Sequence, residues 1–120
     1  MKVIVSASGR DLDSEVDPRF GRAGRFIAVD PDTLEFEVLE NTQNLQASQG
    51  AGIQAATLVA RHKPAAVLTG NCGPKAFQTL QAAGIPVVVG VSGKVRDVVE
   101  KYRKGEYSAA AAANVEGHWM

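Results

Sequence analysis

The chain has 120 residues and a mass of 12.7 kDa, the size of one ordinary domain. Its 13 basic and 13 acidic residues cancel, and a pI near 6.7 argues against a dedicated nucleic-acid binder, which usually has a basic domain. No apolar run approaches the roughly 18 residues that cross a bilayer, and the single cysteine, Cys72, excludes an internal disulfide framework. We therefore expect a folded cytoplasmic domain that binds neither nucleic acid nor a membrane.

The first third of the chain predicts three strands and one long loop. Residues 2–6 form a short apolar run, which is typical of a buried strand rather than a signal peptide. Residues 9–25 have no apolar period but carry four arginines among three glycines, and ordered loops of this length are often functional. Residues 26–29 and 34–38, separated by turn residues, predict an antiparallel hairpin at an edge of the sheet.

The second strand of this hairpin has an alternating pattern. Leu34, Phe36 and Val38 are expected on its covered face, while Glu35 and Glu37 point into water. The residues that follow, 41–50, are polar and are predicted as a loop.

Three helices and two more strands are predicted in the rest of the chain, over residues 51–63, 65–69, 75–83, 85–91 and 93–104. Pro64 ends the first helix, Gly84 ends the second, and Ser92 is expected to cap the third. Residues 1–105 are thus expected to form one α/β domain, and the alanine-rich tail, 106–120, to be frayed or loosely helical. The fold class is a three-layer α/β/α domain with a mixed five-stranded sheet covered on both faces.

Three predicted loops fall at the carboxyl ends of the parallel strands, where α/β proteins bind ligands. They cover residues 6–10, 70–75 and 90–94, and each contains glycine and a cation. The last two lead into helix N-termini, whose free N–H groups favour anions. If the arginine-rich loop folds over the same edge, guanidinium groups complete a site for a compact anion. In any one loop alone, the glycines are equally consistent with tight turns.

Other chemistries lack their signatures. Gly9, Gly21 and Gly24 do not form a dinucleotide fingerprint, and the chain has no nucleotide P-loop. Neither His62 nor His118 stands at metal-motif spacing from other ligands. Carboxylates concentrate in turns and on the hairpin, which does not indicate a two-metal site.

Cys72 has two interpretations. A lone cysteine is most often a small buried apolar residue. Its place between Gly70 and Gly73, before a helix, also favours a thiolate, which would be a soft metal ligand or a redox-sensitive group. Both interpretations stay open at this point.

A set of short motifs is spread over roughly residues 1–105: residues 17–22 (DPRFGR), Phe26, Asp30, Asn44, 50–52 (GAG), 70–76 (GNCGPKA) and 84–87 (GIPV). In type and spacing, these motifs resemble the dinitrogenase iron–molybdenum cofactor biosynthesis family. The resemblance implies a ribonuclease H-like topology without the catalytic carboxylates of that fold. It also implies an anionic metal–sulfur cargo, either a molybdenum–copper sulfide cluster or a precursor of the iron–molybdenum cofactor. The chain lacks the histidine-rich stretch of some relatives, which argues against direct histidine ligation. It also lacks a radical-enzyme domain, so it is not expected to synthesise that cofactor itself.

The leading hypothesis is therefore a noncatalytic carrier of an anionic, molybdenum-containing cluster, with a further protein for delivery or regulation. The metal ligand, if the protein provides one, is Cys72, and Phe20 would shield the sulfides. The full set of expected binding residues is Arg10, Arg19, Phe20, Arg22, Arg25, Gly70, Asn71, Cys72, Gly73, Lys75, Ser92 and Lys94.

Two alternatives come from other classes. A regulatory interaction module would use the edge strand and the arginine loop to contact a protein, without obligatory metal. An enzyme acting on a small phosphorylated or carboxylated substrate would need a base–nucleophile pair, which the sequence does not indicate.

Neutral net charge does not argue against a local anion site, because the charges are segregated. Residues 26–60 carry five carboxylates and no Lys or Arg, whereas residues 61–104 carry eight bases and two acids. The bases thus gather around the later loops and helices.

Overall fold

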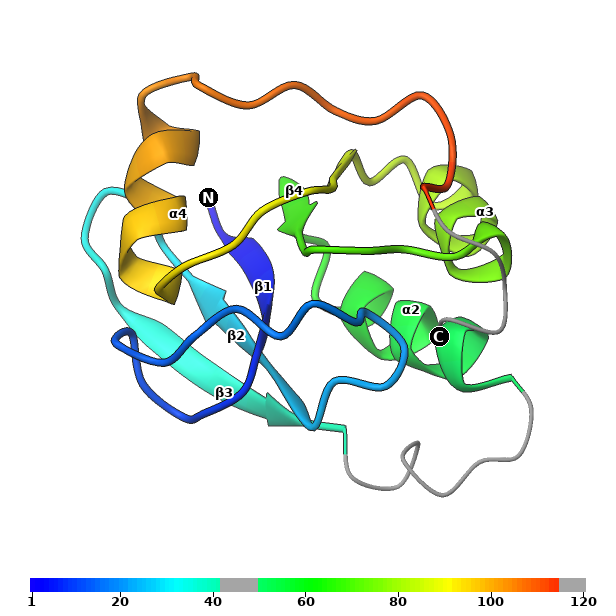
Figure 1. The fold of residues 1–120 in the computed structure, drawn as a ribbon, viewed down its shortest axis with the longest axis horizontal. Helices are drawn as coiled ribbons and strands as arrows, with labels where there is room; N and C mark the ends of the chain where they lie inside the picture. The colour runs from blue at the N-terminus through cyan, green and yellow to red at the C-terminus, as the bar shows by residue number, and fades with distance from the viewer. Residues whose placement is uncertain (42–49, 115–120) are drawn as a thin grey trace.

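The computed structural model describes residues 1–41 and 50–114 and contains a mixed five-stranded sheet (Figure 1). The strand order is β3-β2-β1-β4-β5. β1 pairs antiparallel with β2 and parallel with β4, and β5 extends the parallel part. The strand bounds are β1 Val3–Ala7, β2 Arg25–Val29, β3 Phe36–Glu40, β4 Ala66–Leu68 and β5 Val87–Val88. The predicted mixed sheet with an antiparallel edge hairpin is confirmed.

Helices cover both faces of the sheet, which confirms the three-layer α/β/α architecture. α2 (Ala51–Arg61) and α3 (Pro74–Ala82) lie side by side on one face, and α4 (Val95–Arg103) lies on the other (Figure 1). The ribonuclease H-like topology that the resemblance implied stays a prediction.

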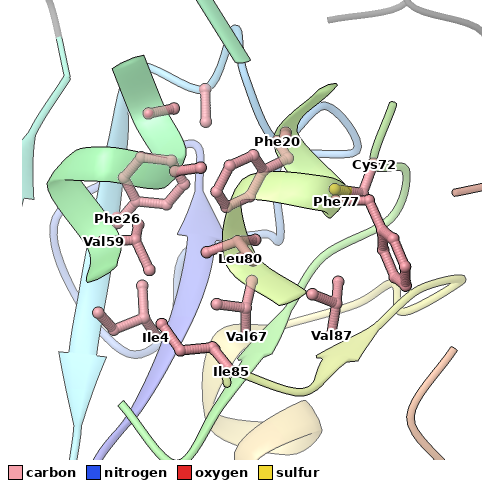
Figure 2. Close-up of a cluster of buried hydrophobic side chains, with 14 of the residues drawn as sticks. Ile4, Phe20, Phe26, Val59, Val67, Cys72, Phe77, Leu80, Ile85 and Val87 are labelled. Atoms are coloured by element: carbon pink, nitrogen blue, oxygen red, sulfur yellow. The ribbon is translucent and has the colours of Figure 1, made fainter. Parts of the chain in front are cut away.

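The core has two parts, one on each face of the sheet. Beneath α2 and α3, the Phe20 and Phe26 rings lie with their centroids 5.1 Å apart, and Leu80 and Val67 pack nearby (Figure 2). On the α4 side, alternate strand residues meet the valine stripe of that helix, Val95, Val98 and Val99. Every residue of β1 is buried because both of its faces are covered, which explains its continuous apolar run.

Helix ends follow the predicted signals with one exception. Pro64 follows α2, Pro74 occupies the first turn of α3, and Gly84 has the left-handed φ of 75° that ends this helix. Ser92 was expected to cap α4, and this is wrong: the cap residue is Lys94. The helix starts later than predicted: Lys94 has an extended backbone and pairs with Glu15 of the long loop.

The predicted faces of the edge strand are partly wrong. Leu34 lies in the turn with φ 65°, and Phe36 is 42% exposed. The buried residue is Leu39, which packs on the α2 side, while Val38 is half-buried on the α4 side. The alternation is misleading here because an edge strand is incompletely covered on both faces. Glu37 is exposed, as predicted.

Residues 106–114 are neither frayed nor helical, which corrects the expectation for this part of the tail. They form an extended segment, here called the strap, that runs from the end of α4 past β5 to α3 (Figure 1). Tyr107 packs on the α4 side of the core, whereas Ala110 and Ala113 pack on the α3 side.

Some expectations fall outside the described residues. These are the structure of the predicted loop at 42–49, which includes Asn44, and that of the tail beyond residue 114, which includes His118. Within residues 1–41 and 50–114, no helix is long and apolar enough to cross a membrane.

Candidate anion-binding site

The three predicted loops meet at the carboxyl edge of the parallel strands. The long loop, residues 9–25, crosses this edge and forms hydrogen bonds with the loops at 70–75 and 90–94. The N–H of Val16 donates to the Gly93 carbonyl at 2.8 Å, and the N–H of Phe20 donates to the Asn71 carbonyl at 3.1 Å. The Asn71 side chain returns a bond to the Pro18 carbonyl at 3.0 Å. The arginine-rich loop therefore lies over the predicted edge.

Two buried hydroxyls anchor the long loop from below. Ser6 Oγ, at the end of β1, lies 2.8 Å from Thr69 Oγ1 and donates to the Asp17 carbonyl at 2.7 Å. Both side chains are fully buried. Unpaired buried hydroxyls are costly, so this pair fixes how closely the loop approaches the sheet.

Arg10 and Arg25 share one carboxylate at this edge. Arg10 Nε lies 3.0 Å from Glu40 Oε2, and Arg25 Nε lies 3.6 Å from Glu40 Oε1. Arg25 also donates from Nη1 to the Ser8 carbonyl at 2.7 Å. The hydrogen bond from Arg10 and the charges of both guanidinium groups hold the pKa of Glu40 below its usual range. One carboxylate thus faces two cations, which leaves a positive excess.

The other predicted cations differ in their surroundings. The Arg19 side chain is half exposed, and its Nε lies 3.8 Å from Asp17 Oδ1. Lys75 and Lys94 are exposed at the starts of α3 and α4, and Arg22 is half-buried in the long loop. Ser92, also predicted to bind, is exposed beside Lys94.

The N-terminus of α3 provides backbone donors. Gly73 caps this helix, and its carbonyl accepts from the Phe77 N–H at 3.0 Å. The N–H groups of Lys75 and Ala76 belong to the first turn, where no intrahelical acceptor exists. Such donors, with the positive end of the helix dipole, favour an anion.

Cys72 is a buried neutral thiol. Its side chain is fully buried, with Sγ 3.8 Å from the Gly73 carbonyl, and burial raises the pKa of the thiol to about 12. Of the two interpretations of Cys72, this conformation favours the small buried apolar residue over the thiolate, because desolvation disfavours the charged form. Metal ligation by Cys72 stays a prediction that requires the loop at 70–73 to open. Among the described residues, no three His, Cys, Asp or Glu side chains converge to hold a metal ion.

Two further predicted residues lie below the surface. Phe20 is fully buried in the core against Phe26 (Figure 2). Gly70 is buried against the backbone of Pro18. A Cβ on Gly70 would lie 2.8 Å from Pro18 Cα, so the glycine permits the two loops to cross. Shielding of a ligand by Phe20 stays a prediction that requires the ring to leave the core.

Sequence reasoning missed two residues of this region. Glu40 lies beyond the predicted strand at 34–38, and it binds two arginines. Asn114 bonds to the loop at 70–72 from the tail. The alternating strand pattern could have placed Glu40 near the start of β2, whereas an asparagine after five alanines carries no such signal.

The topology and the loops crossing its carboxyl edge are those of α/β domains that bind ligands outside their parallel strands. The chain belongs to the dinitrogenase iron-molybdenum cofactor family, whose model matches residues 1–105. It is similar to the apo form of the orange protein from Desulfovibrio gigas, with 43% identity and a TM-score of 0.92 over 95% of this chain and 96% of that one.

Two other relatives extend the comparison. TM1290 of Thermotoga, a protein named for NifB, is 30% identical with a TM-score of 0.80, covering 97% of this chain and 98% of that one. The uncharacterised protein MJ0580 of Methanocaldococcus jannaschii is 27% identical over 97 residues, which is 78% of this chain and 81% of that protein.

Proposed function

We propose that this protein is a noncatalytic carrier of an anionic metal–sulfur cluster related to the iron–molybdenum cofactor. The observation that carries the proposal is the crossing of the long loop over residues 70–75 and 93–94, which gathers cations and helix N-termini at one edge. Membership of the dinitrogenase iron-molybdenum cofactor family supports a cargo of this kind.

Charge and hydrogen-bond donors at this edge suit a compact anion. Arg19, Lys75 and Lys94 are exposed there, and the first turn of α3 adds N–H groups. Arg10 and Arg25 contribute the positive charge that Glu40 leaves uncompensated. A sulfide-rich cluster would be held by these outer contacts, which require no ligand from the protein.

A molybdenum–copper sulfide cluster is the cargo we propose to test first. Copper(I) is a soft ion that prefers sulfur ligands, and tetrathiomolybdate supplies four sulfides in one dianion. Cys72 would join as a copper ligand only after its loop opens, because its Sγ is buried. As a carrier, the protein would also need a second protein that delivers or collects the cluster.

The carrier is proposed to be noncatalytic because the carboxylates and the thiol near the arginines do not form a catalytic pair. Among these cations, the carboxylates of Glu40 and Asp17 are paired with arginines, and the thiol of Cys72 is buried, so these described groups form no base–nucleophile pair. The arrangement is suited to binding and orienting an anion rather than to acid–base chemistry.

The test is anaerobic titration of the apo-protein with tetrathiomolybdate and copper(I). We expect visible charge-transfer absorption and molybdenum and copper that co-elute with the protein. Arg19→Ala and Lys75→Ala should each weaken binding several-fold, more so at low salt. Arg61→Ala is the matched control, because Arg61 is exposed at the end of α2, before the start of β4. Absence of co-eluting metal from the wild-type protein would overturn the proposal.

A regulatory interaction module is the second candidate. It is favoured by the edge strand β3, where Phe36 is 42% exposed beside a cavity of about 370 Å³ that is also lined by Met1, Glu35 and Glu37. Capture of a defined partner by apo-protein, insensitive to metal and lost in Phe36→Ser, would favour this role.

A further inference from the structure

The strap, residues 106–114, runs along the edge of the sheet formed by β5. It leaves α4 at Gly105 and passes the edge strand β5, where the N–H of Ala110 donates to the Val87 carbonyl at 2.7 Å. Ala110 and Ala113 pack against the buried cluster that contains Cys72. The strap therefore lies beside the loop at 70–73, which the proposed cargo would have to contact.

Asn114 fastens the end of the strap to this loop by four hydrogen bonds. Its side-chain Oδ1 accepts from the Cys72 backbone N–H at 2.8 Å, and its backbone N–H donates to the Cys72 carbonyl at 3.2 Å. Its Nδ2 donates to the Gly70 carbonyl at 3.3 Å and to Asn71 Oδ1 at 3.1 Å. Asn71 in turn bonds to Pro18, so Asn114 joins three segments of the chain.

We propose that Asn114 is a positioning residue that keeps the loop at 70–73 covered by the strap. The strap must then detach before the cargo can contact this loop. The inference rests on the proposed function. An anion needs N–H groups that point at it, and the Cys72 N–H is already directed at Asn114 Oδ1. The amide oxygen thus occupies the place of an anionic acceptor.

The contacts of the strap suit local detachment. Ser108, Ala109, Ala111 and Ala112 are exposed, and Tyr107, Ala110 and Ala113 are only partly buried. Segments with few buried apolar contacts open at a much smaller cost than global unfolding. The strap can therefore open while the sheet and its helices stay folded.

The first measurement needs no cargo. Alkylation of Cys72 by iodoacetamide at pH 8 reports how often its loop is uncovered, because Sγ is buried when the strap is in place. Asn114→Ala removes three of the four hydrogen bonds and should accelerate alkylation by roughly ten- to a hundred-fold, as expected from the loss of a few hydrogen bonds. An unchanged rate, with circular dichroism confirming the fold, would overturn the proposal.

A second variant opens the strap without altering the loop or Asn114. Ala110→Pro removes the N–H that bonds to Val87 and should also accelerate alkylation. Glu106→Ala is the control, because the side chain is exposed at the start of the strap, away from the loop at 70–73, and its rate should match the wild type. If Ala110→Pro matched the wild type while Asn114→Ala did not, strap detachment would be excluded.

The last measurement connects the strap with the cargo. Binding of tetrathiomolybdate with copper(I) to Asn114→Ala should be faster and at least several-fold tighter than to the wild type. Slower or weaker binding would overturn the proposal, since Asn114 would then belong to the site instead of competing with the cargo. Failure of the wild type to bind any metal refutes the carrier function, whereas the alkylation rates still decide whether the strap guards the loop.

Discussion

Gly70 lies against the backbone of Pro18, with room for a hydrogen but not for a methyl group. A Cβ on Gly70 would lie 2.8 Å from Pro18 Cα and 2.9 Å from the Pro18 carbonyl oxygen. This approach brings the long loop onto the residues after β4, and it sets the geometry of the whole carboxyl edge.

Gly70→Ala should therefore separate the two loops. We expect a loss of about 1–3 kcal/mol in the free energy of unfolding, because a backbone contact must shift to admit the methyl group. Urea unfolding measures the loss. Gly24→Ala is the matched control, since a Cβ there meets no heavy atom of the described residues within 4 Å. Equal stabilities of the two variants would contradict the close approach.

The buried hydroxyl pair below the loop should behave as a unit. Ser6→Ala leaves Thr69 Oγ1 and the Asp17 carbonyl without this partner and should cost about 1–3 kcal/mol. Thr69→Val tests the other side, and a double-mutant cycle should give a coupling of about 0.5–3 kcal/mol. Ser8→Ala, at an exposed serine just before the long loop, should change stability by less than about 0.5 kcal/mol. Additive single effects would show that the pair does not interact.

Cys72 should make stability depend on alkaline pH. Burial raises the pKa of the thiol from 9.0 to about 12, so above pH 9 the unfolded chain loses a proton that the folded chain retains. The unfolding free energy therefore falls as pH rises from about 9 toward 12. Between pH 7.5 and pH 10, the wild type should lose about 1 kcal/mol more than Cys72→Ala. A difference that does not vary with pH would contradict a buried neutral thiol.

Glu40 should limit anion binding at the edge. Glu40→Gln removes the charge that Arg10 and Arg25 share, so thiomolybdate binding should tighten several-fold with a steeper dependence on salt. Glu35→Gln removes the same charge at the far end of the hairpin and should leave binding nearly unchanged. Weaker binding of Glu40→Gln than of the wild type would mean that the carboxylate positions the two arginines for the cargo.

The same carboxylate gives a second observable at acidic pH. Because Arg10 and Arg25 hold the pKa of Glu40 below its usual range, the carboxylate stays charged to lower pH than an ordinary glutamate. Titration of Glu40 by NMR should therefore show a lower midpoint in the wild type than in Arg10→Ala. An identical midpoint would show that Arg10 does not bind this carboxylate in solution.

Most of the fold could be predicted because its signals are local. The apolar run of β1, the spacing in α4 and the glycine and proline punctuation of α3 each depend on nearby residues. Errors arose where distant segments intervened. β3 lies at an edge with neither face fully covered, and the long loop pairs with Lys94 and displaces the start of α4.

The sequence alone determined the order of the elements, the mixed sheet and the edge at which three glycine-containing loops meet, because apolar period and turn chemistry act over a few residues. Only the tertiary structure decided the state of the groups at that edge. Glu40 binds arginines from two other segments, Cys72 is desolvated, and Asn114 bonds to a loop 42 residues away. These outcomes depend on contacts between segments distant in sequence, and it is such contacts that set burial, charge pairing and pKa.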